Sequence, residues 1–318
     1  MIALSRLLLM VILQFGAAAG YAQGFPVKPV RIITAEVGGG ADFIARLVAQ
    51  GLGAALGQQF FVENRGGNVI LSVDAVAKAP PDGHVLLLYA NAVWTLPLLQ
   101  SVPYDPLKDL APLTLVASSP NLIVVHPSLP VKTLPALIAL AKARPGELNY
   151  STGTPGSAGH LAAELFKAMA GLNIVRISYK GAGPALNALI GGEVALHFST
   201  VASGSLHVKS GRLRALAVTS AQPTALFPEL PTAAASGVPG YEAVGSYGMF
   251  APAKTPDALI ARLNQEIARL LARGDTRERL LNAGAEAIGN SPAAFAAMIA
   301  AETMRIGKVI RDGGMRIE

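Results

Sequence analysis

The amino-acid sequence predicts an α/β protein that is divided into two lobes, with two crossing segments between them. The first observation is a repeated order of parts: a short apolar run, a loop of small residues and an amphipathic stretch of helical period. This order is typical of parallel βα units. The second observation is that proline-containing stretches interrupt it at 127–130 and 223–240. Because 318 residues are enough for two domains, we expect the chain to cross between lobes near both stretches.

The composition excludes several classes of protein. With 52% hydrophobic and 14% charged residues, the chain is too apolar to be disordered. It has no cysteine, which excludes a disulfide, a thiolate nucleophile and a Cys-ligated metal. The five histidines are dispersed, and the net charge of +6 comes from scattered basic residues. We therefore expect no metal, no cofactor and no nucleic-acid partner.

Residues 1–22 have the parts of a secretory signal peptide. Arg6 precedes an apolar run at 7–20, and small residues stand before the bond that follows Ala22. The run is shorter than the roughly 20 residues that a membrane-spanning helix needs, and no later segment is a convincing span. We predict cleavage after Ala22 and a periplasmic protein.

The first βα unit, at 30–56, has a glycine-rich loop between its strand and its helix. The β-branched run VRIIT is followed by AEVGGGAD and then by an amphipathic stretch. Asp42 stands where a carboxylate caps a helix or stabilises its first turn. A helix N-terminus carries free N–H groups and about half a positive charge, so it attracts anions where glycines allow close approach. The loop at 35–42 is therefore a candidate anion site.

The strand predicted at 84–90 ends in a second group of candidates. Its continuous apolar run is expected of a strand that helices cover on both faces. Asn91, Ala92 and Trp94 follow its carboxyl end, where open α/β sheets bind ligands, although Trp94 suits simple packing equally well. Other strands are expected at 60–63, within 115–126, and at 174–179, 194–199, 213–219 and 241–250. Helices are expected at 69–79, 133–143, 206–209, 256–272, 275–283 and 292–310.

A second unit, at 148–172, repeats the design of the first. The residues LNYSTGTPGSAGHLAAELFKAMAGL again read as a strand, a small-residue loop and an amphipathic helix that runs to residue 170. A third small-residue loop, at 180–184, follows the strand expected at 174–179 and opens another helix. Two helix N-termini that face each other across a cleft would form pincers for a small carboxylate.

A series of motifs runs along the chain after the predicted signal peptide. They include KPVRII, GGGAD, VENRGG, DAVAKAPPDGHVLLL, NYSTGTPGSAGHLAAELFKAMAGL, ISYKGAGPALNALIGGEV, GRLRALAVTS and RERLLNAGAEAIGNSP. In order and spacing, the chain resembles the substrate-binding proteins of tripartite tricarboxylate transporters, the Bug family of periplasmic receptors. The resemblance covers nearly the whole chain after residue 22.

The resemblance implies a type II-like periplasmic-binding-protein fold that closes on a small carboxylate. In the family, loops from both lobes hold the ligand largely through backbone amides and ordered water. We place lobe 1 at 23–122 and 245–318, and lobe 2 at 123–244. Carried over to this chain, and with Asn91 added, the ligand-binding residues are Ala35, Val37, Gly38, Gly39, Gly40, Ala41, Asp42, Asn91, Ser151, Thr152, Gly153, Thr154, Gly156, Ser157, His160, Tyr179, Gly181 and Ala182.

The function implied is capture of a di- or tricarboxylate, or a related organic anion, for a tripartite tricarboxylate transporter. Its partners would be the ligand and the membrane subunits of the transporter, and we expect a monomer. A periplasmic partner of a receptor kinase would use the same pocket without a transport role, so the sequence leaves both open. The chain has no G-x-S-x-G elbow and no cysteine nucleophile, so we expect no enzymatic activity.

Overall fold

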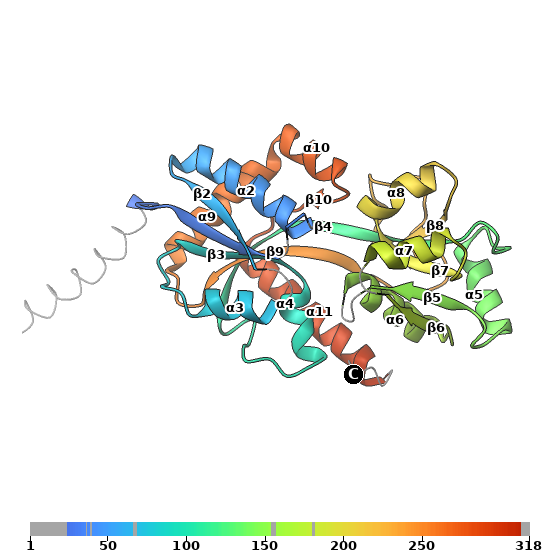
Figure 1. Cartoon of the computed structure of the whole chain (residues 1–318). Helices are drawn as coiled ribbons and strands as arrows, with labels where there is room; N and C mark the ends of the chain where they lie inside the picture. The colour runs from blue at the N-terminus through green and yellow to red at the C-terminus, as the bar shows by residue number, and fades with distance from the viewer. Residues whose placement is uncertain are drawn as a thin grey trace, which may run out of the picture.

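The computed structural model describes residues 24–35, 37–38, 40–65, 69–153, 157–179 and 182–312, so the predicted signal peptide lies outside the described residues. Two lobes stand side by side, and two long strands pass between them (Figure 1). These strands are β4 (Leu110–Val125) and β9 (Val244–Pro252). The predicted two-lobed α/β fold with two crossing strands is therefore confirmed.

Lobe 1 is built on a sheet of order β2-β1-β3-β9-β4. The first three strands are parallel, and β9 runs antiparallel to both β3 and β4. The strands named for the first time are β1 (Val30–Thr34), β2 (Phe60–Asn64), β3 (Val85–Ala90) and the short β10 (Glu286–Ala287), which pairs with β4. The helices are α2 (Gly40–Leu56), α3 (Val69–Ala77), α4 (Ala92–Thr95), the 3-10 helix η1 (Leu96–Leu98), α9 (Asp257–Ala272), α10 (Gly274–Asn282) and α11 (Pro292–Asp312).

Lobe 2 repeats this plan with a sheet in which β4 lies between β8 and β7, followed by β5 and β6. β5 is parallel to both β6 and β7, whereas β4 is antiparallel to its neighbours. The strands are β5 (Asn149–Thr152), β6 (Val175–Ser178), β7 (Leu196–Thr200) and β8 (Arg214–Val218). The helices are α5 (Leu134–Ala143), α6 (Ala158–Ala170), α7 (Ala182–Ile190) and α8 (Val201–Lys209).

The long strand β4 belongs to both sheets. It pairs with β9 as far as Pro120, and from Asn121 onward it pairs with β7. The first crossing therefore lies within a continuous strand, and the proline-containing stretch at 127–130 follows that strand inside lobe 2. The division of the chain at 122–123 and 244–245 stays a proposal.

Each lobe has a hydrophobic core of its own. The buried cluster of lobe 1 draws on segments within 25–117 and 249–299, and the two clusters of lobe 2 draw on residues within 122–241. Among the described residues, no buried apolar cluster joins the lobes. They meet instead at the crossing strands, at the contact between α11 and α6, and where Thr224 donates a hydrogen bond to Glu286 of β10. This arrangement favours relative motion of the lobes.

Most of the expected elements are present, and the differences have local causes. Helix α8 begins five residues before the expected start at 206, because Thr200 Oγ1 accepts a hydrogen bond from the Ser203 N–H at 3.2 Å and caps it. The short α4, η1 and β10 were not expected, since such brief elements have no clear period. No helix in the described part of the chain is long and apolar enough to span a membrane.

Candidate functional site

Helix N-termini gather where the parallel strands end. In lobe 1, α2 follows the carboxyl end of β1. In lobe 2, α6, α7 and α8 follow β5, β6 and β7 in turn. Each helix presents backbone N–H groups that have no partner within the helix, together with the positive end of its dipole. The two predicted pincer loops therefore occupy equivalent positions in the two lobes.

The loop of lobe 1 is held by its own carboxylate. Asp42 lies in the first turn of α2, accepts the Gly38 N–H at 2.9 Å and the Asn64 side-chain amide at 2.8 Å, and pairs with Arg46 at 2.9 Å. Burial opposes its ionisation, but these hydrogen bonds hold the pKa of Asp42 below its usual value. Asp42 therefore positions the loop, and it occupies the Gly38 N–H that was predicted to bind ligand.

The start of α2 lies against the crossing strand β9. A Cβ on Gly40 would lie 2.5 Å from the Tyr247 hydroxyl, so only glycine allows this approach. Tyr247 pairs with Ala90 at the end of β3 and was missed by sequence reasoning. Of the other predicted loop residues, Ala35 and Ala41 are buried, whereas Val37 is 72% exposed at the surface of the loop.

A hollow of about 110 Å³ opens in lobe 2 between the starts of α6, α7 and α8. Its walls are small, hydroxyl-bearing or aromatic, and none of its lining side chains carries a formal charge apart from the ionisable His197. The lining residues are Thr152, Gly153, Ser157, Ala158, Gly159, Ala182, His197, Phe198, Ser199, Thr200 and Ser203. The hollow therefore unites four predicted residues of two separate loops, namely Thr152, Gly153, Ser157 and Ala182.

Backbone donors line this hollow at the start of α6. Ser157 caps the helix, and its Oγ accepts the His160 N–H at 3.4 Å. The N–H groups of Ala158 and Gly159 belong to the first turn, where no intrahelical acceptor exists. Gly159 packs against β7, since a Cβ there would lie 2.7 Å from the Phe198 carbonyl oxygen. This close packing brings the donors of α6 next to the end of β7.

Two buried polar side chains complete the hollow. Thr152 is 2% exposed, and its hydroxyl has no hydrogen-bond partner among the described residues. His197 is 5% exposed, and its Nδ1 lies 2.8 Å from the Ser151 carbonyl oxygen and 3.1 Å from Ser151 Oγ. Because a buried hydroxyl is nearly always bonded, the unpartnered hydroxyl of Thr152 is a candidate for a ligand contact.

His160 and Tyr179, two predicted ligand residues of lobe 2, form hydrogen bonds outside the hollow. The ring of His160 is buried, and its Nε2 accepts a hydrogen bond from Arg176 Nη1 on β6 at 2.8 Å. Burial and the Arg176 charge lower the pKa of His160. The Tyr179 hydroxyl donates to Glu193 at 3.4 Å. Neither side chain lines the hollow, and their assignment as ligand contacts stays a prediction.

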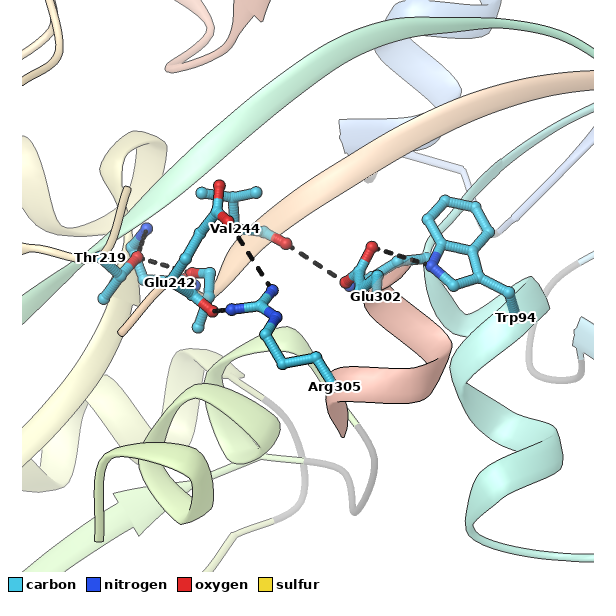
Figure 2. A network of polar contacts seen from close by, with 9 residues as sticks. Trp94, Thr219, Glu242, Val244, Glu302 and Arg305 are labelled. Atoms are coloured by element: carbon cyan, nitrogen blue, oxygen red, sulfur yellow. Dashed lines mark hydrogen bonds and ion pairs between the residues drawn. The ribbon is translucent and has the colours of Figure 1, made fainter. Parts of the chain in front are cut away.

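Asn91 and Trp94 lie at the crossing, where they meet α11. Trp94 is fully buried, and its Nε1 donates to Glu302 on α11 at 3.0 Å, while the Asn91 amide donates to the Val244 carbonyl of β9 at 3.4 Å. Figure 2 shows Glu302 reaching Trp94 and Arg305 reaching Glu242, which lies just before β9. Burial raises the pKa of Glu302. These contacts fasten α11 to the crossing.

Some predicted residues are not placed, and others were missed. Gly39, Thr154, Gly156 and Gly181 lie outside the described residues. Sequence reasoning missed His197 and the three hydroxyl residues that follow it in the hollow, Ser199, Thr200 and Ser203. The strand expected at 194–199 was the available signal, but no glycine-rich loop follows it, and the next helix was expected only at 206–209.

Comparison with known proteins gives consistent results. The family model described as the tripartite tricarboxylate transporter family receptor matches residues 44–315. Protein BugT of Bordetella pertussis is 36% identical over 321 residues, which cover 98% of each chain. The structure of R. palustris Rpa4515 with adipate has a TM-score of 0.80 and 35% identity, covering 92% of this chain and 99% of that one. MatC from Rhodopseudomonas palustris with bound malate has a TM-score of 0.74 and 28% identity, covering 90% of this chain and all of that one (100%).

Proposed function

Because the chain belongs to the Bug family of tripartite tricarboxylate transporter receptors, we propose that it captures a small organic carboxylate in the cleft between its lobes. One observation carries the proposal: three helix N-termini of lobe 2 converge on a hollow that is rich in hydroxyl groups. The structures of Rpa4515 and MatC were solved with adipate and malate, which are both dicarboxylates. A di- or tricarboxylate is the ligand class that we assign.

The chemistry of binding needs no buried cation. A carboxylate that enters the hollow exchanges its water for the N–H groups of Ala158 and Gly159 and for nearby hydroxyls, which are charge-assisted hydrogen bonds. The positive ends of α6, α7 and α8 add a favourable field for an anion. Selection then rests on shape, amides and bridging water, and the second carboxylate would meet the N-terminus of α2 in lobe 1.

Closure of the lobes follows from differential affinity. Donors from both lobes reach one ligand only when the cleft is closed, so the ligand stabilises the closed form. The separate cores of the lobes allow this motion. Helix α11 lies across the crossing strands, about which the lobes would turn. A closed receptor presents one joint surface of both lobes, which would be the surface that membrane subunits of the transporter recognise in the periplasm.

The Ser–His contact in lobe 2 does not suit catalysis. The Ser151 carbonyl oxygen can only accept, so the His197 Nδ1 that faces it at 2.8 Å carries a proton. That nitrogen is therefore unable to act as a general base for the Ser151 hydroxyl at 3.1 Å. We propose a receptor that binds its ligand without a chemical step.

The test is direct measurement of ligand binding. The protein is purified under native conditions, denatured, and the released small molecules are identified by mass spectrometry. In parallel, a thermal-shift panel compares mono-, di- and tricarboxylates with uncharged analogues such as adipamide beside adipate. A carboxylate at about 100 times its Kd stabilises the folded state by about 2.7 kcal/mol, and adipamide should not. If no carboxylate is released from the protein and none raises its melting temperature, the proposal is overturned.

A pair of glycine variants ties binding to the start of α6. In Gly159→Ala the new Cβ meets the Phe198 carbonyl oxygen at 2.7 Å and pushes the donors out of place, so carboxylate affinity should fall. Gly274→Ala is the matched control, because a Cβ on Gly274 meets nothing within 4 Å. Equal affinities for the two variants would contradict the assignment of this helix. Transport is tested separately, by capture of transporter membrane subunits on the loaded receptor.

A further inference from the structure

The hollow of lobe 2 contains a histidine whose proton position follows from geometry. His197 lies on β7 directly opposite Ser151 of β5 in the parallel register. Its Nδ1 is 2.8 Å from the Ser151 carbonyl oxygen, which has no proton to give. Nδ1 is therefore the donor, and in the neutral ring Nε2 is a hydrogen-bond acceptor. The ring is one of the walls of the hollow.

This acceptor is available within the site. No described residue donates to Nε2 of His197, although the side chain is only 5% exposed. Burial lowers the pKa of His197 and so favours the neutral ring. The hollow thus has the ring of His197 on one wall and, on another, Thr152, whose buried hydroxyl has no partner among the described residues.

An acceptor in an anion site requires a particular ligand. A carboxylate oxygen has no proton and would face the lone pair of Nε2 unfavourably, so Nε2 accepts either from a bridging water or from a separate donor on the ligand, and only a ligand donor distinguishes one carboxylate from another. A hydroxyl group supplies one without charge. An ammonium group also supplies one, but its positive charge would oppose the positive ends of the three helices, and no acidic side chain lines the hollow to offset it.

We propose that His197 determines specificity by accepting a hydrogen bond from a hydroxyl group of the ligand, so that this receptor prefers hydroxycarboxylates over the matching plain carboxylates. The inference rests on the proposed function, since it names the substrate class of the same cleft. In the bound state, the carboxylate next to the hydroxyl meets the N–H groups of α6 and the hydroxyl of Thr152, while the ligand O–H points to Nε2 of His197.

The experiment compares matched ligand pairs by calorimetry on the purified protein. The pairs are malate with succinate and 2-hydroxyglutarate with glutarate, and aspartate tests the ammonium alternative. The hydroxy member of each pair should bind about 10-fold more tightly, which is about 1.4 kcal/mol, since leaving a buried acceptor unpaired is unfavourable. In His197→Met this preference should fall to about 1, while affinity for succinate changes less than about 3-fold. His126→Met is the control, because His126 is bonded to Ser128 outside the hollow and should keep the preference.

The outcomes separate this inference from the proposed function. If no carboxylate binds, the proposed function itself fails. If carboxylates bind but each pair binds equally, or aspartate binds best, or His197→Met keeps the preference, only the role of His197 is overturned. Nitrogen-15 NMR of the histidines in the wild-type protein gives a second readout that needs no variant. Malate should shift the Nε2 resonance of an unprotonated His197 more than succinate does, and a protonated Nε2 in the free protein would refute the inference.

Discussion

Thr152→Val should raise the free energy of unfolding of the protein and lower its affinity for the ligand. The Thr152 side chain is 2% exposed, and its hydroxyl has no partner among the described residues. An unpaired buried hydroxyl costs about 1–3 kcal/mol, and valine has nearly the same shape without the polar group. We expect the free energy of unfolding of the empty protein to rise by about 1 kcal/mol, because valine removes most of the cost of the unpaired hydroxyl.

The same substitution should reduce affinity for the ligand. A hydrogen bond from a hydroxyl to a charged carboxylate contributes about 1.5–3 kcal/mol, so the Kd should increase roughly 10- to 100-fold. Opposite signs for stability and binding are the mark of a group kept for its ligand. A residue that served only the fold would change neither in this way.

Urea unfolding of the empty protein and calorimetry of the best carboxylate measure the two effects. With a slope of about 3 kcal/mol/M, a gain of 1 kcal/mol raises the urea midpoint by roughly 0.3 M. Thr255→Val is the control, because Thr255 is 5% exposed, also has an unpartnered hydroxyl and lies between β9 and α9 outside the hollow. It should gain stability and keep its affinity. A Thr152→Val protein that is less stable and binds normally would refute the reasoning.

Three further predictions address the frame of the site. Gly40→Ala should weaken ligand binding, because the new Cβ would lie 2.5 Å from the Tyr247 hydroxyl. Adding Tyr247→Phe should restore part of the lost affinity in a double-mutant cycle. Strictly additive effects of the two substitutions would argue against this contact. Glu302→Leu should lower the free energy of unfolding by about 1–3 kcal/mol, because it leaves the Trp94 N–H unpaired. It should also shift the fluorescence emission of the single tryptophan. Glu302→Gln keeps an acceptor for Trp94, so stability and emission should both stay as in the wild type. His160 and His197 should make stability depend on pH, because their pKa values are lowered in the folded protein. Below about pH 6.5 the unfolded chain therefore binds more protons than the folded protein. As pH falls further, the free energy of unfolding should decrease by up to about 1.4 kcal/mol per pH unit for each of these histidines. The raised pKa of Glu302 has the opposite effect, since it makes the folded protein more stable as pH falls toward 4.5. The histidine effect is therefore measured in Glu302→Gln as well as in the wild type. Free energies of unfolding of Glu302→Gln that do not change between pH 5 and 6.5 would contradict the prediction.

Local patterns in the sequence predicted the repeated βα plan and the two loops that open α2 and α6. A β-branched run, a glycine-rich or serine-rich loop and a stretch of helical period are each decided by neighbouring residues, so they can be read without a structure. Asp42 is an example, because its contact with the Gly38 N–H joins residues of one turn. The family resemblance, which depends on the order of such motifs, identified the fold for the same reason.

The chemistry inside the hollow was decided by tertiary structure. Ser151 and His197 are 46 positions apart and meet because β5 and β7 are neighbours in a parallel sheet. Trp94 and Glu302 are 208 positions apart and meet because α11 packs on the crossing. Which hydroxyl lacks a partner, and which ring nitrogen carries the proton, depends on such contacts between distant segments. A sequence pattern reports the period of one segment, whereas the strand order and the packing of the lobes decide which side chains meet in space.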